Sequence, residues 1–507
     1  MVSHLSIPLP SLFFLFFFFL LLPIFSLAIP SSPQLDVCIV GSGIAGSSLS
    51  HFLRQYSTDA SKDESTLRIR MFERHSVVGG RMATVTIGGD TFEAGASILH
   101  PKNLHAVNFT ELLKLNRKLP SSSDDSMSLG VWDGGKFVLK TVTVDSEIPF
   151  VQKIVSWANS LYIFLRYGFS LLKMDSFVET TVDKFLKYYE STEERPIFTS
   201  VEEMLKWAGL YDLTTRTLED ELLHVGLSPL LIRELVSVIT RINYGQSCHI
   251  SGLAGAVSLA GSGGGLWAVE GGNWQMAAGL INISDVELHL SERISSISKL
   301  PEYYELNSTT GNSYICNVTV IASPLDELKI QFTPLISVPE RKLQHTYTTF
   351  IRGLLNPAYF GLRAVSDLPE LVGTIEDPEI PFSSISVLKQ HNETDMTYKV
   401  FSRKEMSDAL LDDIFSSRME TIRIDWGAYP HYKAPEVFAP FILDDRHLYY
   451  INAFENAAST METSAVAAEN IARLILARVD EESSSTSSCS DTKLAATDEG
   501  ELLHSDL

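Results

Sequence analysis

Cysteine is scarce in this sequence, with four residues among 507. So few cysteines cannot form the dense disulfide framework of a small secreted scaffold. Cys38 lies within an apolar run and Cys489 within an acidic stretch, whereas Cys248 and Cys316 could pair, which the sequence alone does not decide. Neither a CxxC nor an HExxH motif occurs, and we therefore predict no metal site.

Basic residues are also few: 40 Lys and Arg stand against 62 Asp and Glu, a formal net charge of -22. A chain this acidic is a poor partner for nucleic acid. Part of the charge lies in residues 479–507, which are rich in Asp, Glu and Ser and contain no aromatic residue. Such a composition predicts a disordered acidic tail.

The N-terminus lacks the usual Lys or Arg of a secretory leader but has its other features. Leu12 to Leu22 is an unbroken apolar run, and small residues precede a cleavage point after Ala28. Residues 1–28 are therefore predicted to be a signal peptide; a retained anchor is the alternative, although a bilayer span needs about 20 apolar residues. Glycosylation sequons that favour the secretory pathway begin at Asn108, Asn282, Asn307, Asn317 and Asn392.

A nucleotide-binding turn follows soon after this leader. Leu35 to Val40 predicts a buried parallel strand, and a helix is expected from Ala45 to Leu53. Between them stands the G-x-G-x-x-G pattern of Gly41, Gly43 and Gly46. Glycines at this turn let the backbone approach a pyrophosphate, and the helix N-terminus supplies N–H donors.

The second strand is predicted at Leu67 to Phe72 and ends in Glu73, which is placed to bind a ribose hydroxyl. The alternative for Glu73 is an exposed acid at the end of a strand. Gly79, Gly80 and Arg81 come next and offer more backbone and a fixed positive charge to the same pyrophosphate.

This succession of motifs resembles the amine-oxidase and phytoene-desaturase superfamily of flavoproteins. The segment from Cys316 to Leu325 is similar to the strand that returns to the nucleotide-binding sheet, and Leu448 to Ile475 is similar to the last motif. The resemblance implies FAD as the cofactor and places Glu455, Met461 and Glu462 beside it. No cysteine occupies an attachment position, so the FAD is expected to be non-covalent.

Three further segments narrow the resemblance: "RINYGQS" from Arg241, "GSGGGLWAVEGGNWQM" from Gly261 and "WGAYPHYKAPE" from Trp426. Together they resemble prenylcysteine oxidases, called farnesylcysteine lyases in plants. The implied fold is α/β, a Rossmann-type FAD-binding domain with an inserted α+β substrate domain. Its FAD-binding segments are expected at 35–110, 281–330 and 431–478, with a mainly helical substrate domain at 111–280 and a substrate-domain sheet at 331–430.

The resemblance implies an enzyme that cleaves the thioether of a prenylated cysteine. Water and O2 would be consumed, and cysteine, a prenyl aldehyde and hydrogen peroxide released, during degradation of prenylated proteins in a lysosome or vacuole. Two alternatives keep the same fold. One is another flavin oxidase, for example of the polyamine type, and the other is a non-catalytic flavoprotein that binds prenyl lipids.

Two features of the substrate domain stay open. Val155 to Leu172 is apolar nearly all round, which predicts a core helix or a wall of the prenyl pocket; the alternative is a peripheral membrane contact. His249 and His431 are the candidates to deprotonate an attacking water, since histidine titrates near neutrality, although a structural role is favoured for each.

Overall fold

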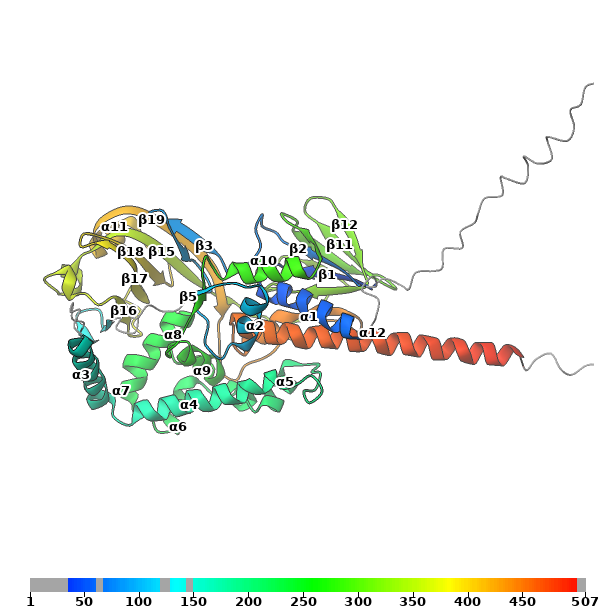
Figure 1. Cartoon of the computed structure of the whole chain (residues 1–507), viewed down its shortest axis with the longest axis horizontal. Helices are drawn as coiled ribbons and strands as arrows, with labels where there is room; N and C mark the ends of the chain where they lie inside the picture. Colours follow the sequence, from blue (N-terminus) through cyan, green and yellow to red (C-terminus); the bar gives the residue numbers. More distant parts are fainter. Residues whose placement is uncertain (1–34, 61–66, 119–127, 143–148, 499–507) are drawn as a thin grey trace, which may run out of the picture.

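The computed structural model describes residues 35–60, 67–118, 128–142 and 149–498. In Figure 1 a nucleotide-binding sheet with its helices forms one half of the molecule. A second, larger sheet and a group of helices form the other half. The predicted signal peptide lies outside the described residues.

A five-stranded parallel sheet forms the first half, in the order β20-β13-β1-β2-β9. Its strands come from distant parts of the chain: β1 (Leu35–Val40), β2 (Leu67–Phe72), β9 (Val286–His289), β13 (Val318–Ile321) and β20 (Leu448–Tyr450). Three helices pack beside it: α1 (Ile44–Ala60), α10 (Trp274–Ile283) and α12 (Met461–Asp498). The predicted return of the segment after Cys316 to this sheet is confirmed by β13, and the strand of the last motif, β20, pairs with β13 at its edge.

Beside this sheet lies a four-stranded sheet built from β10 (Ile294–Lys299), β11 (Tyr304–Ser308), β12 (Ser313–Cys316) and β14 (Gln331–Thr333). Short elements lie between the two halves: α2 (Leu104–Leu112), β5 (Arg117–Lys118) and β8 (Ala268–Val269). A hairpin of β3 (Thr84–Ile87) and β4 (Asp90–Glu93) packs against the larger sheet of the other half.

Helices dominate residues 149–260, as predicted. They are α3 (Pro149–Tyr167), α4 (Ser170–Phe185), α5 (Val201–Ala208), α6 (Leu218–His224), α7 (Pro229–Leu231), α8 (Ser237–Tyr244) and α9 (Gly252–Ala260), with a π-helical turn η5 (Ile232–Val236) before α8. Ser200 caps α5: its hydroxyl accepts a hydrogen bond from the Glu203 amide at 3.3 Å.

A seven-stranded sheet forms the substrate side, in the order β19-β15-β18-β17-β16-β6-β7. Its members are β6 (Leu129–Trp132), β7 (Phe137–Lys140), β15 (Leu343–Leu355), β16 (Leu371–Thr374), β17 (Ser384–Asn392), β18 (Asp395–Ser402) and β19 (Phe415–Pro430), with α11 (Asp408–Ile414) leading into β19. Five of these strands, β15 to β19, lie in the range 331–430, where the sequence predicts a sheet of the substrate domain. The sheet also recruits β6 and β7 from the region expected to be mainly helical, because β6 pairs in parallel with β16.

The cysteine pairing differs from the expectation. Cys38 is bonded to Cys316 across a sequence separation of 278, and Cys248 is free and buried. The idea of a Cys248–Cys316 pair is therefore wrong. The reason is the order of the strands: β13 follows Cys316 directly and pairs with β1, which carries Cys38. The local sequence does not predict which of two such distant strands will pair.

Two other expectations fail for physical reasons. The tail predicted to be disordered at 479–507 continues α12 as helix to Asp498, since extending an existing helix needs no new nucleus; residues 499–507 lie outside the described residues. The apolar segment Val155 to Leu172 is not a core helix: most of its large side chains are exposed at the end of α3 and the start of α4. Within the described ranges no helix has the length and apolar character needed to cross a membrane.

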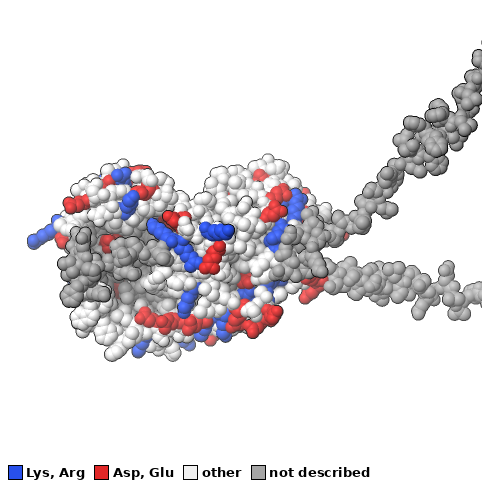
Figure 2. All heavy atoms as spheres, in the orientation of Figure 1, with Lys and Arg blue, Asp and Glu red and all other residues white. Residues whose placement is uncertain are grey.

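The surface carries more acidic than basic side chains, as the composition indicates. Figure 2 shows acidic side chains in a row along the lower edge of the molecule, with basic side chains distributed over the rest of this face. On this face the described residues form no basic stripe of the kind that binds nucleic acid.

Candidate cofactor and substrate site

A cavity of about 490 Å³ lies between the two halves of the molecule. At one end it is lined by the turns after β1 and β2, and at the other by β15, β18 and β19 of the substrate sheet. Of the residues predicted to bind the cofactor, those that line it are Gly41, Gly43, Glu73, Gly79, Gly80, Arg81 and Met461. Gly46, Glu455 and Glu462 do not.

The glycine-rich turn is close-packed on one side and open on the other. A Cβ at Gly46 would lie 2.1 Å from the carbonyl oxygen of Gly41, and a Cβ at Gly41 would lie 2.7 Å from that of Ala322. A Cβ at Gly43, in contrast, would meet no atom nearer than 3.7 Å, the carbonyl oxygen of Gly79. Gly46 therefore serves packing, whereas Gly43 keeps backbone exposed to the cavity, as a bound pyrophosphate requires.

Glu73 is buried at the end of β2 and not an exposed acid. Its carboxylate accepts hydrogen bonds from the Ser42 amide at 3.1 Å, the Ser42 hydroxyl at 2.6 Å and the His75 amide at 2.9 Å. These bonds fix the position of the carboxylate at the cavity wall, where it can accept a hydrogen bond from a ribose hydroxyl.

Arg81 is fixed by two partners behind the cavity. Its guanidinium donates to the carbonyl oxygen of Ala428 at 2.7 Å and pairs with the carboxylate of Glu455. Arg341 pairs with the same carboxylate at 3.1 Å and with Asp326 at 2.7 Å. Burial alone would raise the pKa of Glu455, but the charges of Arg81 and Arg341 outweigh it and lower that pKa. Glu455 therefore positions Arg81 and does not face the cavity.

The N-terminus of α12 reaches the cavity, as predicted, through Ser459, Thr460 and Met461. Glu462 does not follow them. Its carboxylate accepts from the amides of His105 at 2.7 Å and Ala106 at 3.1 Å and so caps the start of α2. Successive helix positions point about 100° apart, which is why the residue after Met461 serves a different neighbour.

Aromatic side chains close the substrate end of the cavity. Tyr244 makes edge contacts with the rings of Tyr429 at 4.8 Å and Tyr432 at 5.1 Å between centroids. The Tyr432 hydroxyl accepts from the amide of Ser459, which ties this cluster to the start of α12. The side-chain amide of Gln246 also connects these segments, because it donates to the carbonyl oxygen of Pro430 at 2.9 Å. The segments beginning at Arg241 and Trp426 therefore meet in one structural unit.

Among the described residues that line the cavity, four have a buried side-chain polar atom without a hydrogen-bond partner. These atoms are the hydroxyl oxygens of Thr346 and Thr348, the indole nitrogen of Trp426 and the amide oxygen of Asn452. Buried polar groups are nearly always satisfied in native proteins. These atoms are therefore suited to pair with a polar ligand, beside apolar neighbours such as Ile242 and Phe401 that suit a hydrocarbon chain.

A charged group stands at the cavity wall on β15 and β19. The His345 ring contacts Asp425 at 2.8 Å and Glu327 at 3.4 Å, and all three residues line the cavity. The hydrogen bond to Asp425 and the nearby carboxylates raise the pKa of His345. With the histidine protonated, one carboxylate charge remains uncompensated, and it favours a cationic group of a ligand.

Sequence reasoning missed Lys399, whose side chain is buried under the loop that follows β4. Its ammonium donates to the carbonyl oxygen of Glu93 and to the hydroxyl of Ser97, each at 3.0 Å. Burial lowers the pKa of Lys399 to about 8, against the opposing effect of Glu93. Burial also raises the pKa of Glu93 to about 7. The only sign in the sequence was a lysine within an apolar strand. That Lys399 holds the loop after Glu93 is visible only in the folded structure.

Replacing Glu93 with glutamine is expected to change how stability depends on pH. The folded state holds a proton on Glu93 up to a pKa of about 7, whereas the reference pKa is 4.5, so the free energy of unfolding falls as pH rises between these values. One pKa unit is about 1.4 kcal/mol, which bounds the effect at about 3 kcal/mol. Urea unfolding of both proteins at a series of pH values measures it; equal slopes from pH 4.5 to 7 would contradict the assignment.

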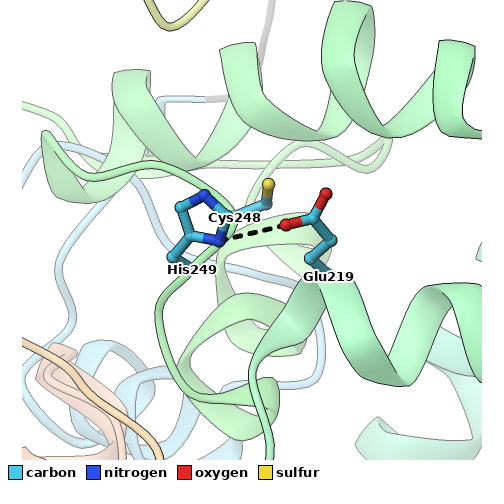
Figure 3. Close-up of side chains that lie close together, drawn as sticks. All are labelled: Glu219, Cys248 and His249. Atoms are coloured by element: carbon cyan, nitrogen blue, oxygen red, sulfur yellow. Dashed lines mark ion pairs between the residues drawn. The ribbon is translucent and has the colours of Figure 1, made fainter.

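Neither predicted catalytic histidine reaches the cavity. His249 is exposed on the far side of the Tyr244 turn, and its ring pairs with Glu219 at 3.0 Å (Figure 3). His431 is exposed, with its pKa lowered by partial burial and by Lys342 and other nearby cations. Neither His249 nor His431 is among the residues that line the cavity, so the cavity lends their catalytic role no support and that role stays a prediction.

Glu219, Cys248 and His249 are the one group among the described residues whose metal-ligating atoms lie within 4.8 Å of one another. The thiol of Cys248 is already in contact with the Ser237 hydroxyl at 3.3 Å, and Glu219 is paired with His249. An ion pair beside a buried thiol accounts for the cluster, and the absence of a metal stays a prediction.

The parallel sheet, the open glycine turn and the buried acid after β2 together define a dinucleotide-binding protein of the Rossmann type. A model for an NAD(P)-binding Rossmann-like domain matches residues 39–111. Solved structures with the same fold include putrescine oxidase bound to putrescine, with a TM-score of 0.54 at 15% identity over 88% of this chain and 99% of that one. Cyclohexylamine oxidase from Brevibacterium oxydans has a TM-score of 0.53 at 17% identity, over 88% of this chain and all of the other.

The family model for prenylcysteine lyase matches residues 150–488. The chain is 67% identical to farnesylcysteine lyase from Arabidopsis thaliana over 442 residues, 87% of this chain and 88% of that protein. It is 33% identical to human prenylcysteine oxidase 1 over 473 residues, 87% of this chain and 89% of the other. The chain therefore belongs to the prenylcysteine lyase family.

Proposed function

We propose that this protein is an FAD-dependent oxidase that cleaves the thioether of farnesylcysteine. Water supplies the oxygen of the prenyl aldehyde, and cysteine is released as the thiol. The two electrons removed from the carbon next to sulfur reduce O2 to hydrogen peroxide. The observation that carries the proposal is the 67% identity to a farnesylcysteine lyase over nearly the whole length of both chains. A cavity with a nucleotide-binding end and an aromatic, apolar end supports it.

FAD, when bound, supplies the two-electron oxidation at the carbon next to sulfur. The protein supplies position and environment. Gly43, Glu73 and Arg81 would hold the nucleotide and pyrophosphate, and the N-terminus of α12 would offer its amides to the ring. The described cysteines with defined side chains are engaged elsewhere, Cys38 with Cys316 and Cys248 beside Ser237, which supports non-covalent binding.

The substrate fits the other end of the cavity. Ile242, Phe401 and Tyr429 present the apolar surface that a prenyl chain would bury, which excludes water from the reacting carbon. The unpaired hydroxyls of Thr346 and Thr348 and the indole N–H of Trp426 can bond the cysteine end. The carboxylate excess around His345 favours the ammonium group of that end. Such an arrangement distinguishes a lipid-modified amino acid from a plain prenyl lipid.

Mixing the purified flavoprotein with farnesylcysteine in the absence of oxygen tests the reaction. Bleaching of the flavin absorbance, followed by peroxide release when air is admitted, is the expected result. Peroxide from spermine or spermidine would instead favour a polyamine oxidase. If farnesylcysteine binds but leaves the flavin spectrum unchanged, the protein would instead be a non-catalytic flavoprotein that binds prenyl lipids. A series of prenyl lengths then measures the preference for farnesyl.

Variants His249→Ala and His431→Ala are each expected to retain kcat for peroxide production within about threefold. Both rings lie outside the cavity, and a general base at the reacting centre would instead contribute a factor of about 100 or more. Steady-state kinetics across pH 5 to 9 would reveal a missing base. A hundredfold loss in either variant, with the flavin spectrum unchanged, would restore the catalytic role.

We further propose that the protein enters the secretory pathway and works in a lysosome or vacuole. The apolar run Leu12 to Leu22 supports this, and so does the Cys38–Cys316 disulfide, which is typical of oxidising compartments. Four of the five sequon asparagines are exposed and Asn307 is half-buried. A glycosidase-sensitive mass together with an N-terminus at residue 29 would be the expected finding; an unglycosylated cytosolic protein would refute it.

A further inference from the structure

The corner between α3 and α4 exposes an unusual amount of apolar surface. Trp157, Leu165 and Phe169 are 68%, 74% and 72% exposed, and Tyr162, Phe164 and Leu172 are also exposed. We call these six residues the apolar corner. The corner lies at the far end of the substrate half from α12 (Figure 1). Contiguous exposed apolar patches of this kind mark interaction sites on soluble proteins.

The apolar corner carries no free charge. Arg166 is the one charged residue between positions 154 and 172, and its guanidinium turns inward to Glu234, with contacts of 2.8 and 3.0 Å. The neighbouring Tyr167 is buried and donates to the same carboxylate. Lys173, just beyond the corner, donates to the carbonyl oxygen of Gly226. Among the residues from 154 to 172, whose side chains the structure describes, the outward face therefore presents aliphatic and aromatic side chains, and the one charged residue is paired.

The inner side of the same hairpin leads to the cavity. Ile163, Leu171 and Met174 pack against a hydrophobic cluster that also contacts Ile242 and Tyr429. The last two residues line the substrate end of the cavity. One continuous apolar body of side chains therefore runs from the exposed corner to the place where a prenyl chain would lie.

We propose that the apolar corner docks on the surface of a neutral lipid bilayer and inserts its aromatic and aliphatic side chains at the boundary of the acyl chains. Tryptophan and tyrosine favour this boundary, and an amphipathic helical segment without a span can lie in it. The net charge of -22 disfavours an anionic membrane and favours a zwitterionic one. This inference goes beyond the proposed function and does not depend on it.

Flotation of the FAD-loaded protein with phosphatidylcholine vesicles tests the docking. The wild type is expected to float with the vesicles, and no better with vesicles that contain phosphatidylserine. The triple variant Trp157→Gln, Leu165→Gln, Phe169→Gln is expected to lose at least tenfold in partition coefficient. A matched control replaces Leu335, Met419 and Val437, also exposed but elsewhere, with glutamine and is expected to float like the wild type. Flavin absorbance and thermal unfolding confirm that each variant is folded.

The proposal is overturned if the wild type does not float, or if the triple variant floats as well as the control. It is likewise overturned if light scattering shows a wild-type dimer that the triple variant converts to monomer while neither binds vesicles, because the corner then contacts a second copy. Oxidation of a short-chain, water-soluble prenylcysteine analogue without lipid tests the proposed function separately. That activity is expected to be equal in all three proteins.

Discussion

Replacing Gly43 with alanine is expected to lower the affinity for FAD by about 100-fold, roughly 3 kcal/mol, while the apoprotein stays folded. The added methyl group would meet no protein atom nearer than 3.7 Å, so the fold accepts it. It would stand on the cavity wall where the pyrophosphate must approach the backbone. Titration of the apoprotein with FAD, followed by absorbance and by flavin fluorescence, measures the affinity.

The matched variant is Gly46→Ala, one helical turn further on. Here the methyl group would lie 2.1 Å from the carbonyl oxygen of Gly41, a contact that only a shift of the backbone can relieve. This variant is expected to lose stability before any effect on FAD is considered. If Gly43→Ala bound FAD like the wild type, the pyrophosphate would not lie over this turn, and the cofactor assignment would fail.

These two glycines show what the sequence could predict about the site. The pattern of Gly41, Gly43 and Gly46 after an apolar strand is a local feature, and local features translate directly into the turn that the structure contains. The role of Glu73 could be predicted from the sequence in the same way, because this residue ends the next strand of the same unit. Which of these glycines is tightly packed and which faces open space, in contrast, depends on neighbours such as Ala322 and Gly79, which come from other segments.

The parts of the site that the sequence did not reveal all involve pairing between distant segments. Arg341 and Glu455 meet across more than a hundred residues, and Lys399 supports a loop that begins at Glu93. The same limit explains the disulfide of Cys38, whose partner is set by strand order. Composition likewise misled the interpretation of α3: an apolar helix resembles a core helix until the structure shows that one of its faces is exposed.

Glu455→Gln is expected to lower the free energy of unfolding by about 3–5 kcal/mol, because it leaves two guanidinium groups without their shared buried carboxylate. Arg81 would also lose its fixed position at the cavity, so FAD affinity is expected to fall with stability. Denaturant unfolding of the apoprotein and FAD titration separate the two effects. The matched control is Glu287→Gln, which breaks the exposed pair with Arg68 and should cost less than about 1 kcal/mol. Equal losses in the two variants would show that the buried cluster does not organise the site, and that Arg81 is held by the Ala428 carbonyl alone.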